Sequence, residues 1–227
     1  SDSNIVLVGM TMNTGNGGYD VLLIKTDSLG NELWTKTFGG FDWDFGYSVA
    51  ETSDKGYIIG GETYSFGAGN NDIYVIKTTK DGDSLWTRTY GGIQGESCYR
   101  IRETNFGNLI LCGYTESYGA GKKDSYVIHA SPIGDTIWTK TVGGIEDDEA
   151  YDIINTIDSE YVYVGYSRSY GNGGKDYSIY KIQNDASVEW NVDYSWVEEG
   201  DDELNSIKEF SDGSFALAGT TNSLGMG

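Results

Sequence analysis

The sequence is short of proline, histidine and cysteine. Its 227 residues include one proline, Pro132, one histidine, His129, and two cysteines, Cys98 and Cys112. Two cysteines are too few for a disulfide framework or a zinc site. We expect both to be buried free thiols, with a disulfide between adjacent strands as the alternative.

Basic residues are scarce as well. The chain has 15 Lys and Arg against 35 Asp and Glu, and its formal net charge of −20 opposes binding to nucleic-acid phosphates and to anionic membrane surfaces. No apolar run approaches the roughly 20 residues of a membrane-spanning helix. Residues Ser1–Ser3 lack the basic start of a signal peptide. We therefore expect a soluble chain that binds no nucleic acid and inserts into no membrane.

Glycine and large aromatic residues are abundant instead. The chain has 33 glycines, 18 tyrosines and 6 tryptophans. Glycine-rich turns between short segments of aromatic and β-branched residues are typical of all-β proteins. Hydrophobic residues make up 38% and charged residues 22%, as in ordinary folded proteins, so the glycines mark loops rather than a disordered segment.

A repeat of 52 residues runs through the sequence. The residues that recur at this interval are Trp34, Trp86, Trp138 and Trp190, and also Asp20, Asp72, Asp124 and Asp176. The text around the first three tryptophans is nearly copied, as in Leu33-Trp34-Thr35 and Leu85-Trp86-Thr87. Such regularity indicates one structural unit that recurs along the chain. We expect the four tryptophans to occupy equivalent buried positions on the fourth strand of successive units.

One period contains four segments with the composition of β-strands. These segments are Tyr47–Thr52, Tyr57–Thr63, Asp72–Thr79 and Ser84–Tyr90. Short turns rich in Asp and Gly connect them, which predicts an antiparallel meander. The runs Ile5–Val8, Tyr57–Ile59 and Tyr161–Val164 are continuously apolar. Such runs predict that both faces of the sheets are buried.

A four-stranded antiparallel sheet, buried on both faces and repeated at this period, predicts the blade of a β-propeller. A β-solenoid is the alternative, although its period is usually shorter. We expect a single propeller region over residues 1–227, with a partial blade at 1–46, blades at 47–98, 99–150 and 151–204, and a partial blade at 205–227. Asn4–Thr11 and Ser214–Thr221 match the same part of the repeat and would compete for one position in a four-bladed ring. The chain is therefore expected to be part of a larger ring.

Two propeller families share local features with the repeat. The segment Lys25–Trp34 resembles the tryptophan-docking repeat of pyrroloquinoline-quinone-type propellers, although Asp27 and Gly30 stand one residue closer together than in that family. The segment from Gly60-Gly61 to Trp86 resembles a kelch blade. Over essentially its whole length the chain resembles the propeller repeats of secreted bacterial and archaeal surface proteins. That resemblance implies an extracellular or cell-surface location and no particular activity.

One end of the expected units is acidic. In a propeller meander, the loops between the second and third strands and the loops between blades emerge at the same end, which is the usual ligand face. We predict a ligand-binding surface there that includes Trp43, Trp196, Asp44, Glu96, Asp148 and Asp202. The two tryptophans lie outside the repeat register and are candidates for stacking on a glycan or a partner protein. The recurring aspartates, such as Asp72, follow Gly-containing loops and are expected to fix turns.

Calcium is the metal that such loops would take, because carboxylates and backbone carbonyls are ligands for hard cations. None of the loops has the spacing of an EF-hand, however, and acidic loop residues are usually solvated. No cofactor is therefore expected, with calcium as the alternative.

Catalytic groups are hard to find in the sequence. His129 occupies the place that Lys25, Lys77 and Lys181 hold in the other units, and no nucleophile can be paired with it. We therefore expect a non-catalytic binding or scaffold module, extracellular or at the cell surface, that meets a protein or a glycan. The alternative is a propeller enzyme, either a quinone-dependent dehydrogenase or one that acts on glycosides through paired carboxylates.

Overall fold

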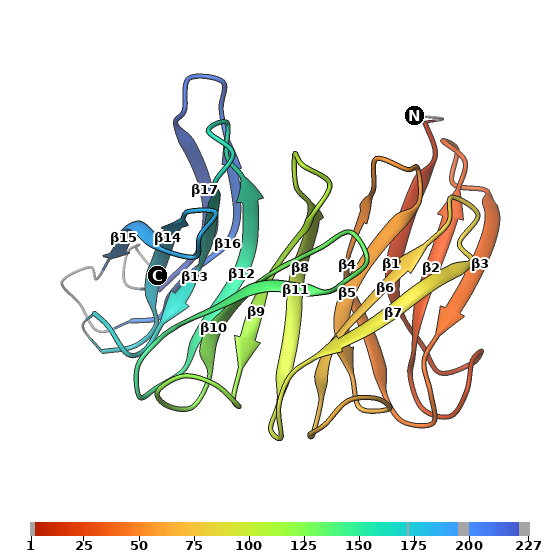
Figure 1. Cartoon of the computed structure of the whole chain (residues 1–227), viewed down its shortest axis with the longest axis horizontal. Helices are drawn as coiled ribbons and strands as arrows, with labels where there is room; N and C mark the ends of the chain where they lie inside the picture. The colour runs from red at the N-terminus through yellow and green to blue at the C-terminus, as the bar shows by residue number, and fades with distance from the viewer. Residues whose placement is uncertain (1–2, 172, 195–199, 223–227) are drawn as a thin grey trace.

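The computed structural model of the chain describes residues 3–171, 173–194 and 200–222. Within these ranges the chain consists of β-strands joined by turns and loops (Figure 1). The strands form five antiparallel sheets that stand side by side in chain order. Among the described residues no helix could cross a membrane.

Three of the sheets are complete four-stranded meanders. The second sheet contains β4 (Asp44–Glu51), β5 (Tyr57–Thr63), β6 (Asp72–Thr78) and β7 (Ser84–Tyr90). The third contains β8 (Glu96–Glu103), β9 (Leu109–Thr115), β10 (Asp124–Ala130) and β11 (Thr136–Val142). The fourth contains β12 (Asp148–Asn155), β13 (Tyr161–Ser167), β14 (Asp176–Ile182) and β15 (Val188–Tyr194).

The two outer sheets are shorter. The first contains β1 (Ile5–Thr11), β2 (Asp20–Thr26) and β3 (Glu32–Phe38), and the fifth contains β16 (Asp202–Glu209) and β17 (Phe215–Thr221). They lie at opposite ends of the row, so the described strands form an open array rather than a closed ring (Figure 1). The all-β prediction of repeated antiparallel four-stranded sheets is confirmed.

The first strand of each complete sheet begins three residues earlier than the sequence pattern indicated. Each of these strands contains a β-bulge, because Tyr47, Tyr99 and Tyr151 have no pairing partner in the second strand. The same irregularity in the fifth sheet leaves out Asn205. An alternating pattern cannot be followed through such an extra residue, so the segments Asp44–Gly46 and their counterparts were missed as strand.

The bulge at Tyr99 also determines which faces of the third sheet the two cysteines occupy, because it pairs Cys98 with Gly113 and Arg100 with Cys112. Both are free and buried, as expected. Cys98 belongs to the core between the second and third sheets, and Cys112 to the core between the third and fourth. The two thiols therefore face opposite sides of one sheet. Burial raises the pKa of the Cys98 thiol to about 12, which keeps it protonated and unreactive.

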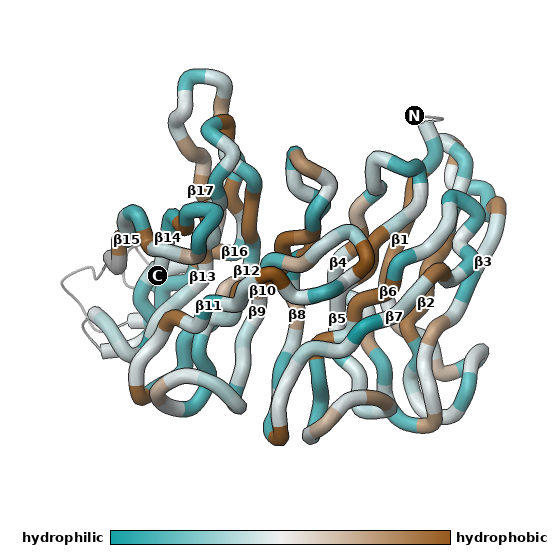
Figure 2. The backbone as a smooth tube through the Cα atoms, viewed as in Figure 1, coloured by the Kyte–Doolittle hydropathy of each residue, from teal (hydrophilic) through white to brown (hydrophobic). Residues whose placement is uncertain are grey.

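Hydrophobic cores lie between neighbouring sheets. Figure 2 shows the apolar segments along the strands of the row. Strand β5 illustrates the arrangement, since Tyr57 and Ile59 pack toward the first sheet while Ile58 packs toward the third. This explains the continuously apolar runs at Tyr57–Ile59 and Tyr161–Val164, which are buried on both faces. The run Ile5–Val8 is different, because β1 has a neighbouring sheet on one side only and its Leu7 side chain is 51% exposed.

The recurring tryptophans lie at one position of the outer strand of each sheet, as predicted. Their partners on the adjacent strand are Lys25, Lys77, His129 and Lys181. They are half-buried rather than buried, because an outer strand has solvent on its free side. Each reaches the next sheet, with ring centroids 6.1 Å apart for Trp34 and Tyr57 and 6.1 Å for Trp138 and Tyr161. Each tryptophan thus joins its own sheet to the following one.

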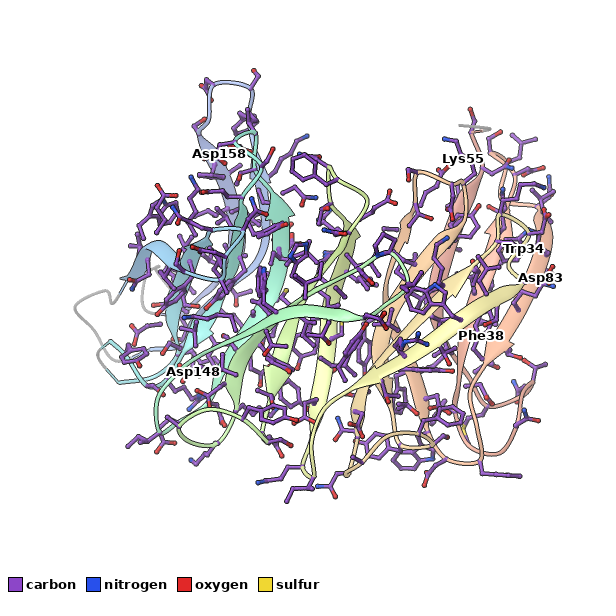
Figure 3. The ribbon with its side chains drawn as sticks, in the orientation of Figure 1. Trp34, Phe38, Lys55, Asp83, Asp148 and Asp158 are labelled. Atoms are coloured by element: carbon purple, nitrogen blue, oxygen red, sulfur yellow. The ribbon has the colours of Figure 1, made fainter. Side chains whose placement is uncertain are left out.

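The turn between the third and fourth strands of the following sheet contacts the tryptophan ring, as Gly82 does with Trp34 and Gly134 with Trp86. In Figure 3, Trp34 of the first sheet lies beside Asp83 of the second. An added Cβ at Gly82, in the same turn, would come within 2.9 Å of the Trp34 ring. Lys36 supports this contact through an ion pair of 2.8 Å with Asp83.

Candidate functional site

Two sets of loops meet at one end of the sheets, which we call the loop end. One set joins the second and third strands, at residues 12–19, 64–71 and 116–123, and the other joins successive sheets, at residues 39–43, 91–95 and 143–147. Backbone hydrogen bonds connect the two sets, as from Tyr64 N to Trp43 O at 2.7 Å. In Figure 3, Asp148 marks this end, while Lys55 and Asp158 mark the opposite, turn end. The expectation that both sets of loops share one end is confirmed.

The four predicted ligand carboxylates, Asp44, Glu96, Asp148 and Asp202, begin the first strands and are all buried. Asp44 shows how they are held. Its Oδ2 accepts hydrogen bonds from the Ser65 hydroxyl at 2.7 Å and from Gly40 N at 2.8 Å, and its Oδ1 accepts one from the Thr63 hydroxyl. These carboxylates lie beneath the loops and clamp them together, whereas the sequence placed them on the exposed acidic surface. A buried carboxylate needs such donors, and the neighbouring hairpin supplies them.

A second buried carboxylate lies next to each of the first three. Asp72 Oδ2 accepts hydrogen bonds from Ala68 N at 2.9 Å and Gly69 N at 3.3 Å, as the turn-fixing interpretation predicted. Burial and the nearby charge of Glu96 raise the pKa of Asp72. An added Cβ at Gly91 would lie 2.2 Å from Asp72 and 2.3 Å from Glu96, so both carboxylates close around this glycine. The residues that the structure describes contain no group of three or more His, Cys, Asp or Glu side chains suited to a metal ion.

Above this constant framework, other loop-end positions carry different residues in each unit. The residue after the buried carboxylate is Phe45, Ser97, Glu149 or Glu203, and the residue before the third strand is Tyr19, Asn71, Lys123 or Lys175. We call the places where these two positions meet the first to fourth junctions. The third and fourth are closed by ion pairs, Lys123 to Glu149 at 3.0 Å and Lys175 to Glu203 at 2.8 Å.

The first junction is aromatic. Tyr19 and Phe45 take the places of the lysine and the glutamate, and their ring centroids are 5.6 Å apart. Trp43 and Tyr64 lie beside them, and the five contacts among the four rings span 5.6–6.4 Å. We call these four side chains the aromatic cluster. Trp43 is 50% exposed and Tyr64 is 41% exposed. Of the predicted site residues that lie in the described ranges, Trp43 is thus the one that is exposed at the loop end.

The other predicted tryptophan, Trp196, lies outside the described residues. Sequence reasoning missed Tyr19 and Phe45 because single residues in separate loops carry no motif. A position-by-position comparison of the repeats could have found them, because Tyr19 and Phe45 stand where the third and fourth units have lysine and glutamate.

His129 is the next-to-last residue of β10, at the end of the strand that is away from Asp124 and the loop end. Its ring packs between Trp138 at 5.2 Å and Tyr161 at 5.5 Å between ring centroids. Burial lowers the pKa of His129. The ring therefore stays neutral at pH 7 and fills the space that a lysine stem occupies in the second and fourth sheets.

Comparisons with known proteins place the fold and leave the activity open. No protein-family model matches the chain. It is 26% identical over 174 residues, 66% of its length, to the regulatory protein FlaEY of Caulobacter vibrioides, and it spans 18% of that protein. A solved protein of unknown function from Bacteroides caccae is similar with a TM-score of 0.54 at 12% identity, over 96% of this chain and 65% of the other. A eukaryotic initiation factor reaches a TM-score of only 0.41 at 9% identity, over 83% of this chain and 43% of that protein. The chain therefore shares with the Bacteroides protein an all-β fold of repeated sheets.

Proposed function

We propose that this chain is a non-catalytic binding module, built from β-propeller blades that repeat every 52 residues as part of a larger ring. Its loop end recognises a protein or a glycan. The extracellular or cell-surface location belongs to the same proposal and rests on the resemblance to secreted surface repeats.

One observation carries the proposal. The units share their buried clamps, such as Asp44 with Ser65 and Asp148 with Ser169, yet differ at the junction positions directly above them. Different side chains on a common framework are what a ligand-specific surface requires, because loops positioned by a rigid scaffold carry binding residues.

The proposal is tested by comparing binding partners of matched variants. A loop-end variant would combine Trp43→Ala, Tyr64→Ala and Arg168→Ala, all exposed positions. A turn-end control would combine Leu29→Ser and Phe106→Ser, which are 85% and 72% exposed. Both, with the parent chain, would be screened against a displayed peptide library and a glycan array. We expect partners of the parent to be lost by the loop-end variant and kept by the control.

Partners that survive in the loop-end variant would contradict the proposal, and so would an absence of any partner. The alternative function is a propeller enzyme. Reduction of a dye in the presence of pyrroloquinoline quinone, or hydrolysis of a glycoside panel, would favour that alternative.

A further inference from the structure

Three carboxylates act on the aromatic cluster, of which Asp42 is exposed, Glu116 is half-buried, and Glu62 is buried with hydrogen bonds from Tyr47 and Asn71. Asp42 directly precedes Trp43. Burial raises the pKa of the Tyr64 hydroxyl, and the charges of Glu62, Glu116 and Asp42 raise it further, which places all three carboxylates within electrostatic range of this ring. In the part of the chain that the structure describes, none of these three carboxylates takes part in a salt bridge.

The later junctions show what the first one lacks. At the third junction the Lys123 ammonium lies 3.9 Å from the centre of the Tyr114 ring and 3.0 Å from Glu149. At the fourth, the Lys175 ammonium lies 4.0 Å from the Tyr166 ring and 2.8 Å from Glu203. In both places this protein therefore holds a cation between an aromatic face and a carboxylate. At the first junction Tyr19 and Phe45 replace this lysine and this glutamate, so rings are present there without a cation. The carboxylates that act on these rings come instead from Asp42, Glu62 and Glu116.

The aromatic cluster is also held in place. An added Cβ at Gly18 would lie 2.3 Å from Cδ1 of Trp43, so the indole rests directly on the glycine backbone. The neighbouring rings meet Trp43 nearly edge-on, with interplanar angles of 77° for Tyr19 and 70° for Tyr64. An exposed indole in this setting can accept a ligand without first being ordered, which lowers the entropic cost of binding.

We propose that the aromatic cluster binds a cationic side chain, a lysine or an arginine, that a partner protein contributes at the first junction. The ring faces attract the cation, and the surrounding carboxylates neutralise it. This inference rests on the proposed function and names the chemistry that its loop end recognises. The net charge of −20 favours the approach of such a partner.

The test uses small probes so that binding elsewhere on an acidic protein does not obscure the result. The probes are Nα-acetyl-lysine methylamide, its ε-trimethylammonium form, and a neutral isostere of the trimethylated form in which carbon replaces the ε-nitrogen. The intact chain would carry 5-fluorotryptophan, and the ¹⁹F signal of Trp43 would be assigned from Trp43→Phe. We expect both cations to shift this signal and the trimethylated probe to bind about tenfold more tightly than the isostere.

Variants locate the site. Because the two Trp43 variants lack the Trp43 ¹⁹F signal, their affinities would be measured by titration calorimetry. Trp43→Ala should weaken binding of the trimethylated probe about tenfold, and Trp43→Phe should restore part of that loss. Glu116→Gln should weaken binding of the cationic probes and leave binding of the neutral isostere unchanged. Tyr170→Ala, a 45% exposed aromatic in a later loop, should leave binding unchanged, and melting curves of all variants establish that they fold.

Equal binding of cation and isostere, or cation binding that Trp43→Ala does not alter, would overturn the inference. If neither cationic probe binds, the inference is overturned as well. These results are separate from the partner screen, because partners lost by the loop-end variant but unaffected by Trp43→Ala alone would leave the proposed function standing and remove only the cation site.

Discussion

Lys77 and Asp54 form an ion pair of 2.9 Å in the second sheet, where the lysine side chain is only 8% exposed. The fourth sheet repeats the pair with Lys181 and Asp158. In the third sheet the same two places hold His129 and Phe106, so the charge and its partner are both absent. A nearly buried ammonium needs a nearby carboxylate, which explains why the two positions change together.

Asp54→Asn should destabilise the fold at neutral pH by about 1 kcal/mol, because the exposed half of the pair limits its strength while the buried lysine still loses its counter-charge. Burial opposes ionisation of Asp54, but hydrogen bonds from Thr52 and Lys77 outweigh it and lower the pKa of Asp54 to about 2. A lowered carboxyl pKa stabilises the fold above the unfolded value and loses this effect as the pH falls toward 2. Denaturant unfolding of parent and variant between pH 7 and pH 2 should therefore show a difference that disappears in acid. A difference independent of pH would contradict this account.

Asp72→Asn should have the opposite sign. Because the pKa of Asp72 is raised in the folded chain by burial and by Glu96, its ionisation costs stability as the pH rises above the unfolded value of 3.8. An asparagine keeps an oxygen for Ala68 N and presents an amide to Glu96. We expect a gain of up to about 1 kcal/mol at pH 7, the size of one hydrogen bond, that vanishes at low pH. Loss of stability at pH 7 would show that the second carboxylate oxygen matters more than the repulsion.

Several turns at the turn end require a left-handed residue. Gly107 and Gly213 have φ of 81° and 82°, while Ser159 occupies the matching place in the fourth sheet with φ of 67°. Ser159→Gly should therefore stabilise the chain by about 1 kcal/mol. The matched reverse change, Gly213→Ala, should destabilise it by a similar amount, since an added Cβ there meets nothing within 4 Å and backbone strain alone decides the result. Thermal melts of both variants check the pair, and equal signs would contradict it.

Trp86→Ala should cost about 2 kcal/mol, less than the roughly 3–5 kcal/mol of a fully buried tryptophan, because the ring is only half-buried. Leu85→Ala serves as the control. That side chain is 56% exposed on the same strand and should cost no more than about 0.5 kcal/mol. Chemical denaturation measures both, and similar costs would mean that Trp86 does not join the second sheet to the third.

Calcium should leave the melting temperature unchanged. The buried carboxylate oxygens that face the loops, such as Oδ2 of Asp44 and of Asp148, already accept protein hydrogen bonds. Melting curves in millimolar calcium and in chelator should superimpose. Calcium at 100 times its dissociation constant would add about 2.7 kcal/mol to the free energy of unfolding of a protein that bound it. A clear rise of the melting temperature in calcium would therefore support a calcium site.

Hydrophobic pattern and turn chemistry predicted the strands closely where both signals were present. Tyr57–Thr63 and Ser84–Tyr90 were predicted with the observed bounds, because Asp- and Gly-containing turns border them. The start of β4 was not, since its bulge at Tyr47 interrupts the alternation. The site was harder still. Trp43 was noticed for its place outside the repeat, but the burial of Asp44 depends on donors from Thr63 and Ser65, which only folding brings to it.

The tryptophan contacts between neighbouring sheets make the outer sheets of the row less stable than the central one. Among the residues that the structure describes, every tryptophan contact and every core joins a sheet to its immediate neighbours, and none joins the first sheet directly to the fourth. Stability in such an array is a sum over adjacent pairs. The third sheet is held from both sides, whereas the first and fifth each have one neighbour. Local unfolding should therefore begin at the outer sheets and reach the central sheet last. The amide hydrogens of β9 and β10 should be the last to exchange with solvent.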